Sequence, residues 1–286
     1  MVIGEALRWA AAVLTEAGID TAALDARVLL MHILGVDAVH LAVRRDQPLT
    51  VQQQMQYEEW IRRREMHEPV AYITGEREFM SLSFLVRPGV LIPRPDTEVL
   101  AEYAIARCGE MERPGVLDAC TGSGALAVSI AHFVPGASVT AVDISDIALN
   151  IARENAARHG VAVKFVRADV IDGLPSFAQP LDMVVSNPPY VRPEVIAGLS
   201  PDVRGYEPLL ALDGGADGLV FYRALVRLAP QVLKKGGRLA FEVGYDQADA
   251  VAAMMDGQFT QIEILRDLAG NARVVAGRLI GQEKID

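Results

Sequence analysis

The sequence predicts an α/β protein, with a doubly wound sheet of seven strands in its larger part and a small helical domain at its N-terminus. From Val99 onward, apolar strand-like runs alternate with helical patterns, which is typical of parallel βαβ units. Before that point the apolar residues recur at spacings of three and four, the period of an amphipathic helix. We therefore expect a helical domain over residues 1–68, a connector over 69–98 and an α/β domain over 99–286.

The helical domain is expected to hold its helices between Ile3 and about Arg64. Its helices are separated by residues that end or break a helix: Gly18, Gly35 and the Gln47-Pro48 corner. Thr50 is a candidate N-cap for a polar helix that continues through Arg64. The basic run Arg62–Arg64 is typical of the solvated face of such a helix.

Residues 69–98 differ from the helical domain in composition. β-Branched and aromatic residues alternate with glycines and with Pro88, Pro93 and Pro95, which predicts a hairpin and a fixed loop. Seven apolar strand candidates follow, at residues 116–120, 138–143, 163–169, 181–187, 238–244, 259–267 and 272–280. Only a short connection separates the last two, so they are expected to form an antiparallel pair at one edge of the sheet.

Composition and charge restrict the function. Hydrophobic residues make up 51% of the chain and charged residues 22%, as in a globular protein with a substantial core. The net charge of −10 gives no general attraction to a phosphate backbone, so nucleic acid is not expected as the main partner.

Cysteine and histidine usage predicts a reducing compartment and no metal. Cys108 and Cys120 have eleven residues between them and no CxxC motif, and the five histidines have no ligand spacing. The N-terminus has neither the basic head nor the long apolar run of a signal peptide, and we expect no membrane span. A cytoplasmic protein is the expectation.

A glycine-rich turn joins the first predicted strand of the α/β domain to a helix, in VLDACTGSGALAVSIA. Gly122 and Gly124 allow backbone N–H groups to approach a bound ligand, although such glycines can also serve helix packing alone. The next strand ends at Asp143, where a carboxylate can accept both ribose hydroxyls of a nucleoside cofactor. Its alternative role is helix capping, for which Ser145 is available instead.

Two kinds of nucleoside cofactor fit this arrangement, a dinucleotide and S-adenosyl-L-methionine. A dinucleotide site usually has a third glycine, and Ala127 takes that place here. Alanine is tolerated there, so the turn leaves both cofactors open. Asp169, at the end of the third strand, is a candidate acceptor for the adenine amino group, with Val170 against the ring, or else a cap or a solvated charge.

The sequence SNPPYV separates the two cofactors. Asn187 lies at the expected carboxyl end of the fourth strand, and Pro188 and Pro189 fix φ and remove two backbone donors. The Asn187 side-chain oxygen and the Pro188 carbonyl can then accept both hydrogens of a planar NH₂ group. Tyr190 would pack on that group and exclude water, while its nitrogen lone pair faces the methyl of S-adenosyl-L-methionine. A rigid turn that only ends a buried strand is the alternative.

With these motifs, the chain resembles the glutamine N5-methyltransferases that modify class 1 peptide chain release factors, a family of class I, Rossmann-like, S-adenosyl-L-methionine-dependent enzymes. The resemblance spans nearly the whole chain, and its narrower marker is LIPRPDTE. Its specific pieces are PVAYITGEREFMSLSFLVRPGVLIPRPDTE, DACTGSG, AVDIS, SNPPYV, EPLLALDGGADGLVFYR and FEVGYDQ. It implies that the cofactor contacts Cys120, Thr121, Gly122, Ser123, Gly124, Asp143, Asp169, Val170 and Asn187. It implies a substrate site at Asn187, Pro188, Pro189 and Tyr190, with Asn187, Pro188 and Tyr190 as catalytic residues.

The resemblance also implies a partner. The N-terminal helices would dock the release factor, whose Gly-Gly-Gln loop would enter the cleft. Alternatives are a sister family that methylates a large-subunit ribosomal protein and shares the CTGSG turn, enzymes that methylate adenine in nucleic acid, and a binding protein without turnover. Arg94 and Glu98 lie in the family's matching loop, where a structural salt bridge and a catalytic role are both open.

Overall fold

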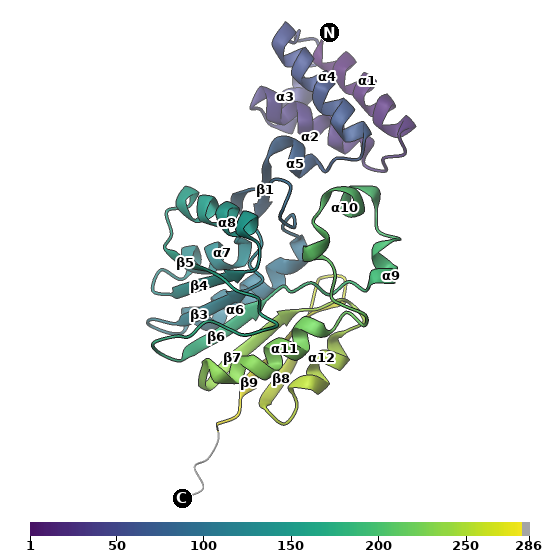
Figure 1. Cartoon of the computed structure of the whole chain (residues 1–286). Coiled ribbons are helices and arrows are strands. Elements are labelled where there is room, and N and C mark those ends of the chain that lie inside the picture. The colour runs from purple at the N-terminus through teal and green to yellow at the C-terminus, as the bar shows by residue number, and fades with distance from the viewer. Residues whose placement is uncertain (282–286) are drawn as a thin grey trace, which may run out of the picture. The chain divides into compact units, whose positions relative to one another are not determined.

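The computed structural model describes residues 1–281 (Figure 1). They form two compact units, each made of two segments: Met1–Glu76 with Ser200–Tyr206, and Arg77–Leu199 with the chain from Glu207 onward. Residues 1–68 lie wholly in the first unit, whereas the expected connector over 69–98 contributes to both. The sequence did not predict that residues 200–206 would belong to the first unit.

The first unit is helical, as predicted. Its helices are α1 (Ile3–Glu16), α2 (Ala22–Leu34), α3 (Ala38–Val43), α4 (Val51–Glu65), α5 (Val70–Thr74) and α10 (Pro201–Tyr206). The apolar faces of α1, α2 and α4 share one core, in which Leu14, Leu29 and Tyr57 are fully buried. Thr50 caps α4 as predicted: its hydroxyl accepts from the Gln53 amide at 3.2 Å.

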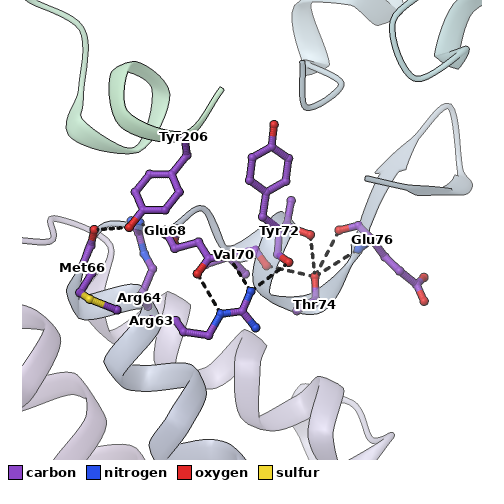
Figure 2. A network of polar contacts seen from close by, with 10 residues as sticks. Arg63, Arg64, Met66, Glu68, Val70, Tyr72, Thr74, Glu76 and Tyr206 are labelled. Carbon is purple, nitrogen blue, oxygen red and sulfur yellow. Dashed lines mark hydrogen bonds and ion pairs between the residues drawn. The ribbon is translucent and has the colours of Figure 1, made fainter. Parts of the chain in front are cut away.

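A polar network lies at the carboxyl end of α4 (Figure 2). The Tyr206 hydroxyl donates to the Met66 carbonyl at 2.7 Å, which ties α10 to the other helices of this unit. The solvated-face interpretation of the arginine run was wrong for two of its three members. Arg64 is buried and donates to Asp25 at 2.8 Å, and Arg63 is paired with Glu68; only Arg62 is largely exposed.

The expected hairpin is present, formed by β1 (Glu76–Phe79) and β2 (Leu82–Leu85). Met80 and Ser81 take φ of 51° and 60° at its turn, the conformation of a two-residue turn that matches strand twist.

The second unit contains the predicted seven-stranded sheet. Its strands are β3 (Gly115–Ala119), β4 (Ser138–Asp143), β5 (Val163–Arg167), β6 (Leu181–Ser186), β7 (Leu233–Glu242), β8 (Phe259–Arg266) and β9 (Ala272–Leu279). All seven predicted strands are confirmed, although β7 begins earlier than expected. Their order is β5-β4-β3-β6-β7-β9-β8, and only β9 runs antiparallel to its two neighbours. The fold is therefore a doubly wound α/β sheet that ends in an antiparallel hairpin.

Helices cover both faces of the sheet (Figure 1). Those of eight or more residues are α6 (Glu98–Gly109), α7 (Ala125–Phe133), α8 (Asp146–Arg158), α11 (Val220–Leu228) and α12 (Ala248–Met255). Short elements are η1 (Pro95–Thr97), α9 (Pro193–Ile196), η2 (Leu209–Ala211) and η3 (Ala229–Gln231). Successive strand residues enter opposite cores: Val116 packs with α6 and α7, and Leu117 with α11 and α12. Among residues 1–281, no helix combines the length and the apolar character that a membrane crossing would need.

Candidate functional site

The candidate site lies where the strand order reverses. The chain runs outward from β3 through β4 to β5, then returns to β6 on the other side of β3. Ligands of open α/β sheets bind at the carboxyl ends of the strands at this point. A pocket there is lined by turns and loops that follow several strands, including Cys120, Thr121, Gly122, Ser123, Asp143, Asp169, Val170, Asn187 and Pro189. The predicted residues Gly124, Pro188 and Tyr190 are not among its lining residues.

The two glycines of the turn after β3 have different surroundings. Both take positive φ, 56° at Gly122 and 82° at Gly124. A Cβ at Gly124 would stand 2.9 Å from the Ala152 Cβ on α8, whereas one at Gly122 would meet no heavy atom within 4 Å. Gly124 therefore allows the turn to pack on α8, and Gly122 leaves open space at the pocket. Cys120 also has positive φ, 62°, without being glycine, so backbone strain is concentrated in this turn.

The Asp118 side chain, on β3, stabilises the turn through two hydrogen bonds. Its Oδ2 accepts from the Thr121 hydroxyl at 2.6 Å and from the Ala127 amide at 3.2 Å. The side chain is fully buried, and burial raises the pKa of Asp118 to about 7, against the opposing effect of these two donors.

Asp143 is held by backbone groups at the end of β4. Its two oxygens accept from the Gly122 and Ser145 amides, each at 2.9 Å. Burial raises the pKa of Asp143, and these backbone donors oppose the rise. Ser145 caps α8 by accepting from the Ala148 amide at 3.2 Å, as predicted. Each Asp143 oxygen retains a lone pair for another donor.

Asp169 and Val170 stand beside this carboxylate on the pocket wall. Asp169 Oδ1 accepts from the Ile171 amide at 2.9 Å, so one of its oxygens is partly used in a local turn. Val170 is 3% exposed and gives the pocket an apolar surface.

The Asn-Pro-Pro-Tyr corner follows β6, all six residues of which are buried. The Asn187 side chain donates from Nδ2 to Thr97 Oγ1 at 3.1 Å. This bond leaves Oδ1 as the end of the amide that can accept from a ligand. The Tyr190 hydroxyl donates to Glu242 Oε1 at 3.3 Å, and the Tyr190 carbonyl accepts from Gln247 at 3.0 Å.

Arg94 and Glu98 both make structural contacts. Arg94 lines the pocket and forms an ion pair with Glu207, which is buried and also accepts from the Ile92 amide at 3.0 Å. Glu98 accepts from the Met80 amide at 2.8 Å and so holds the turn of the β1-β2 hairpin.

Sequence reasoning missed three supporting residues. Thr97 lies inside the PRPDTE segment and Glu242 inside FEVGYDQ, but no feature of the sequence distinguished either residue from its neighbours. Asn155 on α8 is fully buried and makes three hydrogen bonds, two with the Leu85 backbone and one to the Ser123 carbonyl at 2.9 Å. An asparagine on the apolar side of a helical pattern was the available signal for Asn155.

Comparisons with known proteins identify the family of the chain. Residues 5–75 match the family described as PrmC N-terminal domain, and residues 97–198 match the methyltransferase small domain. A release factor glutamine methyltransferase of Geobacter sulfurreducens is 41% identical over 278 residues, covering 97% of this chain and 96% of the relative. One from Moorella thermoacetica is 42% identical, covering 95% of each chain.

Among solved structures, a methyltransferase from Pyrococcus furiosus covers 71% of this chain and 91% of its own, with a TM-score of 0.50 and 19% identity, a likeness in fold. The relatives match at well above 30% identity over nearly their full length. The chain is thus a methyltransferase and belongs to the family of release factor glutamine methyltransferases.

Proposed function

We propose that this chain methylates the side-chain amide nitrogen, N5, of the glutamine in the Gly-Gly-Gln motif of class 1 translation release factors, using S-adenosyl-L-methionine. The observation that carries the proposal is the Asn187 amide at the pocket wall, whose Nδ2 is bound by Thr97 at 3.1 Å while Oδ1 remains an acceptor. The names of full-length relatives support the choice of substrate.

The pocket residues fit S-adenosyl-L-methionine. Asp143 would accept from the ribose hydroxyls, and Asp169 from the adenine amino group, with Val170 against the ring. The turn Cys120–Gly124 offers backbone N–H groups, and the open space at Gly122 lets a ligand approach closely. The bound cofactor would supply a methyl group on a positively charged sulfur, which a nitrogen lone pair can displace.

The corner would hold the substrate amide by its two hydrogens. Asn187 Oδ1 and the Pro188 carbonyl would each accept one, which turns the nitrogen lone pair toward the methyl group. Tyr190 would pack on the planar amide and exclude water. The nitrogen would form its bond to the methyl group as the sulfur–methyl bond breaks, and it would then release one proton, which leaves for solvent with the departing product.

Each of the three segments would have its own role. Residues 1–68 would dock the release factor, residues 69–98 connect the domains, and residues 99–286 bind the cofactor and carry out the transfer. The match of residues 5–75 to a family-specific N-terminal domain supports the docking role. Release factors act where translation occurs, so the enzyme would work in the cytoplasm. The net charge of −10 favours a protein over a nucleic acid as partner.

The test is transfer of labelled methyl from S-adenosyl-L-methionine to a purified class 1 release factor, with the large-subunit ribosomal protein and short DNA assayed in parallel. Peptide mass spectrometry locates the label. We expect one methyl group on the Gly-Gly-Gln glutamine. Label only on the ribosomal protein or on adenine would overturn the proposed substrate and leave the methyltransferase chemistry in place.

A further inference from the structure

Glu242 is a buried carboxylate directly behind the Asn-Pro-Pro-Tyr corner. It ends β7, is 2% exposed, and does not line the pocket. Its Oε1 accepts from the Tyr190 hydroxyl, while Oε2 has no hydrogen-bond partner among residues 1–281. Leaving a carboxylate oxygen buried without a partner is costly, so this side chain calls for an explanation other than fold stability.

Two hydroxyl groups interact with this carboxylate. One is that of Tyr190, at 3.3 Å. The other is that of Thr97, which opposes the rise in the pKa of Glu242 but forms no hydrogen bond with the carboxylate in this structure. Thr97 in turn accepts from Asn187 Nδ2 at 3.1 Å. A Thr97 hydroxyl turned toward the unpaired Oε2 would therefore join Glu242 to Asn187 through a single group.

A hydroxyl has only one proton, which gives this path a direction. An ionised carboxylate can only accept, so a Thr97 hydroxyl that turns its proton toward Glu242 would offer its oxygen to Asn187. The Asn187 amide must then place its NH₂ group toward Thr97 and Oδ1 away from it. A protonated Glu242 could donate to Thr97 instead, whose own proton would then attract Asn187 Oδ1.

The second orientation would be wrong for the substrate. It would present the Asn187 NH₂ group to the NH₂ group of the glutamine, so that two sets of donors face each other. We propose that Glu242 is a positioning residue for methyl transfer, which acts through Thr97 to hold the Asn187 amide with its oxygen toward the substrate. This inference rests on the role proposed above for Asn187.

The groups around Glu242 determine when it is ionised. Burial raises the pKa of Glu242 to about 7, and Asp96 contributes to the rise; the Thr97 and Tyr190 hydroxyls and Arg273 oppose it. Arg273 is itself paired with Asp96 at 2.9 Å, so its charge is partly neutralised. The Tyr222 hydroxyl donates to the backbone carbonyl of Glu242 at 3.0 Å and not to its carboxylate.

A matched pair of substitutions at Thr97 tests the path. Thr97→Val keeps the shape but removes the hydroxyl, whereas Thr97→Ser keeps the hydroxyl and removes the methyl group. We expect kcat for release factor methylation to fall about tenfold or more in Thr97→Val, because the Asn187 amide loses the partner that orients it, and to stay within about threefold in Thr97→Ser. Calorimetry should give S-adenosyl-L-methionine dissociation constants within about twofold of wild type for both.

The pH profile of Glu242→Gln tests the carboxylate itself. At saturating cofactor, kcat of the wild type should rise with pH through about 7, as Glu242 ionises. In Glu242→Gln this rise should be lost and kcat at pH 8 should be about tenfold lower. A Glu242→Gln profile that keeps the rise at full kcat would overturn the inference, and so would equal losses in the two Thr97 variants.

The two proposals fail in different ways. If the wild type does not methylate the Gly-Gly-Gln glutamine, the proposed function fails. If the wild type is active and Asn187→Ala is not, yet Thr97→Val is as active as wild type, the function stands and the positioning role of Glu242 is excluded.

Discussion

At the scale of single residues, hydrogen bonds within the protein determine which atoms of each polar side chain stay available to a ligand. Thr97 binds the nitrogen of the Asn187 amide, so the oxygen is the end left for a ligand. Backbone amides bind both oxygens of Asp143 yet leave a lone pair on each. These bonds orient the side chains before any ligand arrives, which is a requirement for efficient transfer.

Replacing Asn187 with alanine separates chemistry from cofactor binding. Asn187→Ala should lower kcat for methyl transfer by about a hundredfold or more, because it removes one of the two proposed acceptors for the substrate amide. The dissociation constant of S-adenosyl-L-methionine, measured by calorimetry, should change little. Asn150→Ala, at an exposed position of α8, is the control. Parallel losses of turnover and cofactor affinity would contradict the assignment.

Asp143 should behave in the opposite way. Asp143→Ala removes the candidate ribose acceptor and the partner of the Gly122 amide, so the cofactor dissociation constant should rise by about tenfold or more. Asp146→Ala, in the exposed first turn of α8, should leave the constant unchanged. An unaltered constant in Asp143→Ala would remove this residue from the cofactor site.

At the scale of elements, the turn after β3 is fixed by the helix beside it. Asn155 on α8 accepts from and donates to the Leu85 backbone and donates to the Ser123 carbonyl, so one side chain joins β2, the turn and α8. Gly124 lets the same turn contact Ala152 of α8. The two contacts place the turn, and Gly122 within it, at a defined position beside the pocket.

The two glycines of this turn form a matched pair for mutation. Both have positive φ, so alanine adds backbone strain of about 1–2 kcal/mol at either position. Gly124→Ala also drives a methyl group to 2.9 Å from the Ala152 Cβ, which should lower the free energy of unfolding by about a further 1–3 kcal/mol. Gly122→Ala meets no protein atom and should instead weaken cofactor binding. Chemical denaturation and calorimetry on both variants would show whether the effects separate in this way.

At the scale of the whole molecule, the sequence was sufficient for the sheet and for many of the residues that line the pocket. Their signals are local: an apolar run, a glycine turn, or a strand ending in Asp143 or Asn187. Pairings between distant residues had no such signal. Thr97 meets Asn187 across 90 positions and Tyr206 meets Met66 across 140, so the support of the corner and the placement of α10 emerge only from the folded chain. Helices as short as α3 and α5 are too brief to show a period.

The buried Glu242 also has a consequence for the stability of the whole chain. Its pKa of about 7 in the folded chain lies above the ordinary value of 4.5, so between these pH values the folded chain binds more protons than the unfolded one. The stability that the protonated Glu242 side chain contributes is therefore fully present below about pH 4.5. It declines as the pH rises and is lost above about pH 7. The shift corresponds to on the order of 3 kcal/mol at most.

Glu242→Gln should therefore stabilise the protein while it impairs catalysis. Because glutamine does not ionise, the variant should exceed the wild type in free energy of unfolding by about 1–3 kcal/mol at pH 8, and the difference should shrink toward pH 5. Glu154→Gln, at an exposed ion pair with Arg87, should show no such pH-dependent gain. Denaturant titrations at the two pH values measure both. If the difference in free energy of unfolding between Glu242→Gln and the wild type is the same at pH 5 and pH 8, ionisation of Glu242 does not destabilise the fold.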